Sequence, residues 1–186
     1  MSSVRSVFSL LLTTAFLLTG HGIHMTFLPL MASDIGLSQT VIGISGSAYF
    51  AGFISGAMVT PHIIAKVGHI RSFTTLMAVF LCCFQVLPMT DSSVMWILVR
   101  FLLGAAMCGA YTVVESWLSD QADASAHGRV LGIYTLVVLG AMALGQGLLS
   151  ITYGEAAQVF ALISILIGCA IIPVSLTSSL APAPVP

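Results

Sequence analysis

The most obvious shortage in this sequence is electrical charge. Of 186 residues, five are Lys or Arg and six are Asp or Glu, so only 6% of the chain is charged, whereas a soluble domain carries about 25% charged residues. So few charges cannot cover the surface of a soluble globular protein. The hydrophobic content of 58% and the mean hydropathy of +1.10 exclude that class. The net charge of −1, without a basic run, also argues against nucleic acid as a partner.

Signatures of metal binding and catalysis are missing as well. The four cysteines, Cys82, Cys83, Cys108 and Cys169, have no metal-ligand spacing. The sequence contains no P-loop, which excludes ATP as a direct energy source on this chain, and it has no HExxH or Ser-His-Asp pattern. We therefore expect no enzyme activity, no cofactor and no metal.

Long apolar runs are abundant. The hydrocarbon core of a bilayer is about 30 Å thick and needs about 20 residues of helix to cross it. Because backbone groups in lipid must be satisfied internally, continuous runs of this length predict helices. The sequence predicts an all-α integral membrane protein whose bundle covers residues 1–176, with six transmembrane helices at about 7–31, 41–65, 72–89, 94–118, 130–152 and 156–176. Residues 177–186 are rich in Pro and Ala, which is typical of a linker or tail.

The few loop charges predict an orientation. If the N-terminus is cytoplasmic, the cytoplasmic segments hold Arg5, Lys66, Arg71 and Arg129, and the outer loops hold Asp34, Asp91 and Glu155. Every loop cation then lies on the inner side, as the positive-inside rule requires. We therefore expect both termini in the cytoplasm.

Two ionisable residues remain inside the membrane, both in the fourth span. Arg100 and Glu115 are 15 residues apart, or about 22 Å along a helix, and cannot pair with each other. An intramembrane charge is costly and normally faces a bundle interior or a watery cavity. Arg100 either has such a functional position or extends to the outer interface. Glu115 is either a gate contact or protonatable site, or pairs with Arg71 or Arg129.

Polar side chains in the other spans add candidates for a substrate or proton pathway. His21 and His24 are three residues apart in the first span and share one helical face. This pair is either a lining for substrate or proton or an ordinary packed pair, and a metal site lacks further ligands at a fixed spacing. Tyr49 and Gln146 are the other candidates that we select.

Small residues form two patterns. The second span contains Gly52-Phe-Ile-Ser-Gly56, a face that permits close helix packing. A Tyr followed by Gly-Ala-Met also occurs twice, as Tyr49 with residues 56–58 and as Tyr134 with residues 140–142. The second and fifth spans would be equivalent in a three-plus-three inverted repeat, and such a repeat would account for the similar residues in the two spans.

Three motifs then point to a family. The link between the second and third spans runs from Gly56 to Arg71, the fourth span holds Leu98-Val-Arg100-Phe-Leu-Leu-Gly104, and the fifth holds Gly140-Ala-Met-Ala-Leu-Gly145-Gln146-Gly147. With these motifs in this order, the whole chain resembles the N-terminal six-helix half of the major facilitator superfamily of secondary transporters. Ala65 stands where that family usually has an acidic residue.

The resemblance implies a function and roles for residues. It implies one half of a twelve-helix bundle, a permease half that moves a small solute by alternating access, with Arg100 in proton coupling. The cytoplasmic gate would comprise Gly56, Lys66, Gly68, His69, Arg71, Glu115 and Arg129. The alternative is a transport-inactive truncated permease or a membrane assembly partner.

The expected partners follow from the same reasoning. They are the lipid bilayer, a small-molecule solute and a second six-helix half, which is a second copy, a separately encoded chain or a missing C-terminal half. Compact loops and the family likeness favour a bacterial inner membrane.

Overall fold

The computed structural model describes residues 2–121, 127–152 and 154–177. Over these residues the chain is helical, with six α-helices and one 3₁₀ turn: α1 (Ser2–Asp34), α2 (Gln39–Val67), α3 (His69–Val86), η1 (Leu87–Met89), α4 (Ser93–Gln121), α5 (His127–Thr152) and α6 (Ala156–Ser175). All six α-helices are long and apolar enough to cross a membrane. The prediction of an all-α protein with six transmembrane helices is confirmed. Most of the expected tail at 177–186, and the side chain of Arg5, lie outside the described residues.

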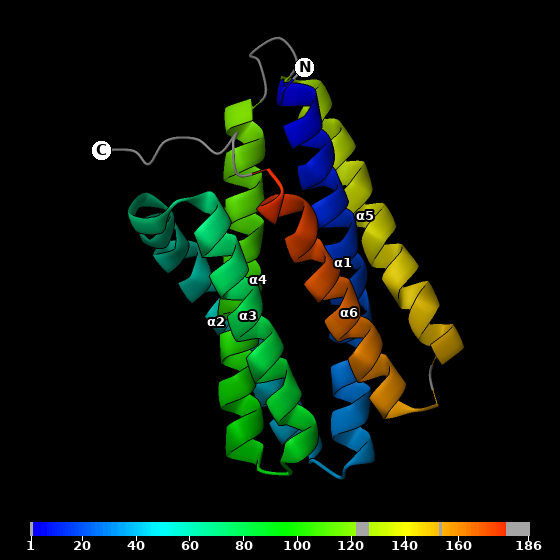
Figure 1. The fold of residues 1–186 in the computed structure, drawn as a ribbon. Helices are drawn as coiled ribbons and strands as arrows, with labels where there is room; N and C mark the ends of the chain where they lie inside the picture. Colours follow the sequence, from blue (N-terminus) through cyan, green and yellow to red (C-terminus); the bar gives the residue numbers. More distant parts are fainter. Residues whose placement is uncertain (1, 122–126, 153, 178–186) are drawn as a thin grey trace.

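Short turns join α1 to α2 and α3 to α4. Gly36, with φ of 83°, turns the chain after α1, and the Ser38 hydroxyl accepts a hydrogen bond from the Val41 backbone at 3.3 Å to start α2. At the turn between α3 and α4, the Trp96 indole donates a hydrogen bond to the Thr90 carbonyl at 2.9 Å. The start of α1 and the end of α6 lie at the same end of the bundle (Figure 1).

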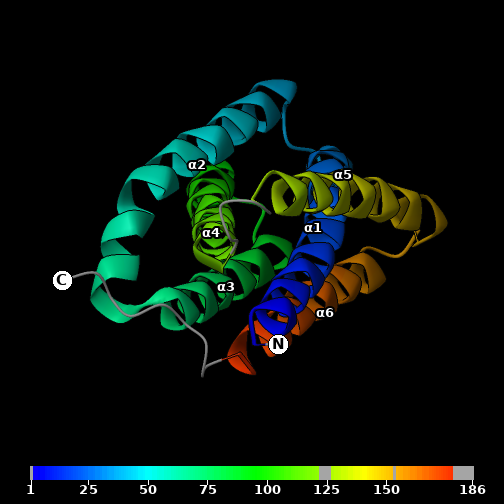
Figure 2. The same cartoon turned by 90° about the horizontal axis from the view of Figure 1, so that it is seen from above.

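The helices are arranged around α1 and α4, which are the most buried of the six. Helices α2 and α3 pack on α4, α5 and α6 pack on α1, and α3 contacts α6. Figure 2 shows α2 and α5 on one side of this pair and α3 and α6 on the other. This arrangement is unchanged when the first three helices are exchanged with the last three, as the three-plus-three repeat requires.

Glycine permits the closest helix contacts. A Cβ added at Gly52 would collide with the Phe101 carbonyl oxygen, and one at Gly56 with the Ala105 carbonyl oxygen, so α2 and α4 touch through backbone. On the other side, a Cβ at Gly22 of α1 would lie 2.5 Å from the Met142 carbonyl oxygen of α5. Helices in lipid associate by this close packing.

Candidate functional site

Polar and aromatic side chains from three helices meet inside the bundle. His21 and His24 of α1 stack with ring centroids 5.7 Å apart, and Tyr49 of α2 lies 6.2 Å and 5.8 Å from their centroids. The Arg100 guanidinium of α4 lies over the Tyr49 ring at 4.6 Å from its centroid, which is a cation–π contact. Tyr111, also on α4, meets His21 edge to face at 6.0 Å. We call these five residues the Arg100 cluster.

Apolar and aromatic residues enclose this cluster. His24 is fully buried, Arg100 is 3% exposed and His21 is 6% exposed. The rings of Phe80 and Phe84 on α3 lie 5.3 Å and 5.8 Å from the His24 ring. Helix α3 therefore covers the cluster on the side of His24.

Several buried polar atoms of the cluster have no hydrogen-bond partner in the part of the chain that the structure describes. Among the described residues, no hydrogen bond reaches His21 Nδ1, either ring nitrogen of His24, the Tyr49 hydroxyl or one terminal nitrogen of Arg100. A buried polar group without a partner costs about 1–3 kcal/mol. Apolar residues at these positions would give a more stable packed core. The unpartnered atoms are therefore free to form hydrogen bonds with water or with a bound solute.

The sequence-predicted candidates divide into two groups. Arg100, His21, His24 and Tyr49 come together in the cluster. Gln146 does not join them: it is exposed on α5 and lines a shallow groove of about 430 Å³ whose other lining residues are Thr26, Leu30, Leu149 and Ser150.

Tyr111 belongs to the cluster but was not among the predicted pathway residues. It lies 11 residues after Arg100, which is three helical turns and nearly the same face of α4. That spacing was available in the sequence as a signal. The aromatic wall of Phe80 and Phe84 could not be anticipated in this way, because it depends on how α3 packs against α1.

The link between α2 and α3 is a tight turn. Gly68 has φ of 80° and ψ of 168°, a region that is essentially limited to glycine. Its backbone N–H donates to the Ile64 carbonyl at 2.8 Å and closes α2. Lys66 and Arg71, on either side of the turn, are exposed.

His69 starts α3 and ties it to α4. Its Nε2 lies 3.2 Å from the Ser116 hydroxyl, and its ring centroid lies 5.9 Å from that of Trp117. Gly56 is not part of this turn. It lies earlier in α2, where it packs on Ala105 of α4.

Glu115 lies on the side of α4 that meets α5. It is exposed, and its Oε1 accepts a hydrogen bond from the Tyr134 hydroxyl at 3.0 Å. Within the described part of the chain it forms no ion pair with Arg71 or Arg129, and Arg129 is exposed on α5. The contact joins α4 and α5.

Comparisons with known proteins agree with this architecture. A family model described as Major Facilitator Superfamily matches residues 10–186. The chain is 29% identical over 178 residues to a protein of Salmonella arizonae named "Uncharacterized MFS-type transporter YcaD", a match that covers 95% of this chain and 47% of the relative. The protein of the same name from Salmonella typhi is 28% identical over 173 residues, covering 93% of this chain and 45% of the relative.

Two facts follow from these matches. This chain spans about half the length of the curated relatives it matches. Its six helices together make a multi-pass membrane protein, and the family match covers nearly all of them. The chain belongs to the Major Facilitator Superfamily.

Proposed function

We propose that the chain forms one six-helix half of a secondary transporter, which moves a small solute by alternating access together with a second six-helix bundle. The observation that carries the proposal is the Arg100 cluster. A membrane protein that only packed against its neighbours would have no need for a buried guanidinium beside two imidazoles, since intramembrane charge is costly and marks function.

The depth of the cluster suits such a role. Arg100 lies seven residues after the start of α4, and Tyr49 lies ten residues after the start of α2, which places their backbones about 10 Å and 15 Å along these helices. His24 lies ten residues before the end of α1, at the same end of the bundle. In a hydrocarbon core about 30 Å thick, these side chains reach the middle, where transporters of this kind bind solute.

In this proposal, Arg100 controls the charge of the cluster. Its guanidinium stays protonated at physiological pH and supplies a fixed positive charge beside the two histidines. Two events can alter the net charge of the cluster: entry of a charged solute, or protonation of His21 or His24. We propose that protons are coupled to transport at this cluster.

The second bundle is expected on the side that α2 and α5 share. These two helices are the least buried of the six, and both carry large exposed apolar side chains: Phe50, Ile54 and Met58 on α2, and Leu136, Leu139 and Leu144 on α5. The relatives are about twice as long as this chain. The partner bundle would come from the rest of a longer chain, from a separate chain or from a second copy.

The turn between α2 and α3 is proposed as part of a cytoplasmic gate. Lys66, Gly68, His69 and Arg71 lie there, and Gly56 fixes α2 on α4. Glu115 and Arg129 are the proposed gate residues of α4 and α5. Placing this end in the cytoplasm satisfies the positive-inside rule, with both termini in the cytoplasm of a bacterium and the bundle in its inner membrane.

Uptake into proteoliposomes tests the proposal. Vesicles containing the protein are incubated, with an inward proton gradient, in an equimolar mixture of monosaccharides, amino acids, carboxylates and aromatic cations, and their contents are measured by mass spectrometry. We expect at least one compound to accumulate above the level in empty vesicles. Arg100→Leu should abolish this accumulation, and Leu98→Ala, a control at an exposed position of the same helix, should retain it.

Two outcomes would contradict the proposal. If no compound accumulates when a second bundle is shown to be present by native mass spectrometry, the chain is a transport-inactive permease or an assembly partner. If Arg100→Leu transports as well as the wild type, the cluster is not the functional centre.

A further inference from the structure

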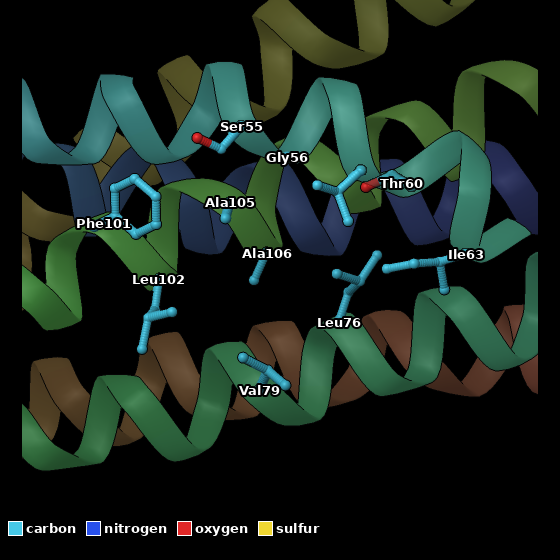
Figure 3. Close-up of a pocket in the computed structure, with 11 residues that line it drawn as sticks. Ser55, Gly56, Thr60, Ile63, Leu76, Val79, Phe101, Leu102, Ala105 and Ala106 are labelled. Atoms are coloured by element: carbon cyan, nitrogen blue, oxygen red, sulfur yellow. The ribbon is translucent and has the colours of Figure 1, made fainter.

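An apolar groove opens between α2 and α3, and α4 forms its floor. It has a volume of about 360 Å³ and an exposed lining that is wholly apolar. In Figure 3, Leu76 and Val79 of α3 lie opposite Leu102 and Ala106 of α4, and Ile63 of α2 lies near one end. In a bilayer, an opening between helices that protein does not fill is filled by lipid.

The groove follows from how three helices pack. Gly56 holds α2 against the backbone of α4 at Ala105. Helix α3 also packs on α4 but has little contact with α2, and Figure 2 shows α2 and α3 separating from the turn that joins them. Ala105 and Ala106 of α4 have small side chains, so the groove between α2 and α3 is deep at these positions.

The length of the groove matches one leaflet of a bilayer. Its α2 wall runs from Ser55 to Ile63, which is about 12 Å of helix. One leaflet contributes about half of a hydrocarbon core about 30 Å thick. The groove therefore suits an acyl chain that enters from the leaflet at the end of the bundle where α2 turns into α3.

Two cations stand at that end of the groove. Lys66 follows Ile63 by three residues and Val59 by seven, so it shares their helical face. Arg71 lies in the first turn of α3, and both cations are exposed. Within the described residues, neither forms an ion pair with Glu115 or Asp120, the described acids of this half of α4.

We propose that this groove binds an anionic phospholipid, with one acyl chain between α2 and α3 and the headgroup phosphate on Lys66 and Arg71. Apolar lining, leaflet length and unpaired cations at one end are the three features that such a lipid requires. Basic sites between helices bind anionic headgroups in this manner. The proposal goes beyond transport and does not depend on which solute is carried.

Native mass spectrometry of the delipidated protein tests the site. The protein is titrated with phosphatidylglycerol and, separately, with phosphatidylcholine of the same acyl chains, and retained lipid is counted. We expect preferential retention of phosphatidylglycerol. Lys66→Gln combined with Arg71→Gln should weaken its apparent affinity about 25-fold, since each cation near an anionic headgroup contributes about a factor of five. Arg129→Gln, at an exposed cation on α5, should leave it unchanged.

A second pair of variants tests the groove itself. Val79→Trp places a large ring in the groove and should reduce retention of phosphatidylglycerol. Leu139→Trp, at an exposed position of α5, should not reduce it. Glycerol phosphate serves as a headgroup-only probe and should not compete at millimolar concentration, because the chain contributes the apolar part of the binding. Far-UV circular dichroism confirms that each variant is folded.

Three results would overturn the proposal. Equal retention of the two lipids would show that the cations do not select a headgroup. Loss of retention in Arg129→Gln or Leu139→Trp to the same extent would show a non-specific effect. Full competition by glycerol phosphate would show an anion site without a role for the groove.

Discussion

Replacing Arg100 by leucine should abolish transport without lowering the stability of the protein. The guanidinium is 3% exposed in the middle of the bundle and contacts the Tyr49 ring at 4.6 Å. Placing an arginine at the centre of a membrane helix costs about 2.5–3.5 kcal/mol, and leucine gains about 0.3–0.6 kcal/mol at such a position. A desolvated cation–π contact stabilises the folded protein by about 2 kcal/mol. On these terms, the free energy of unfolding of Arg100→Leu should be higher than that of the wild type by about 1–2 kcal/mol.

Unfolding by SDS, followed by circular dichroism, measures this difference, because the unfolded chain exposes position 100 to water and headgroups. Uptake is measured on the same preparation. We expect a stable protein that does not transport. A decrease of more than about 1 kcal/mol in the free energy of unfolding would contradict this expectation, since it would show that Arg100 is a structural residue. Leu98→Ala, two residues earlier on an exposed face, is the control for changes in α4 that are unrelated to the cluster.

Three smaller predictions concern helix contacts and turns. Gly22→Ala places a Cβ 2.5 Å from the Met142 carbonyl oxygen, where ordinary van der Waals contact begins at 3.4 Å. Helices α1 and α5 must then separate, and the free energy of unfolding should fall by about 1–3 kcal/mol. Gly140→Ala adds a Cβ that meets nothing within 4 Å and should not lower it. Gly68→Ala should lower the same quantity by about 1–3 kcal/mol, because its φ of 80° and ψ of 168° suit glycine alone, and an unchanged SDS midpoint would contradict this. Tyr134→Phe removes the hydrogen bond to Glu115 and should cost about 0.6 kcal/mol; a loss above about 2 kcal/mol would show a larger network.

Hydropathy alone was enough to predict the six helices, because crossing lipid demands long apolar runs whatever the tertiary packing. The pairing of His21 with His24 also followed from their spacing on one helix. That Arg100 meets Tyr49 could not be predicted in this way, because the contact exists only where α2 and α4 touch through glycine.

Other features depend on the relative rotation of helices, which periodicity does not define in an apolar span. Gln146 is exposed on α5 and not part of the cluster for this reason. Glu115 meets Tyr134 rather than a loop cation because α4 and α5 approach each other at that level. The groove between α2 and α3 has no sequence signal of its own, since it results from small side chains on α4 and from the divergence of two helices.

Alternating access requires the Arg100 cluster to open to water during transport, although it is largely buried in this structure. The most direct measurement is thiol labelling of His21→Cys, in a background where the four native cysteines are replaced by alanine, with a membrane-impermeant maleimide applied from each side in turn. Leu18→Cys, fully buried on the same helix, is the control. We expect His21→Cys to be labelled from both sides and Leu18→Cys from neither. Absence of labelling at position 21 from either side, or equal labelling at both positions, would contradict it.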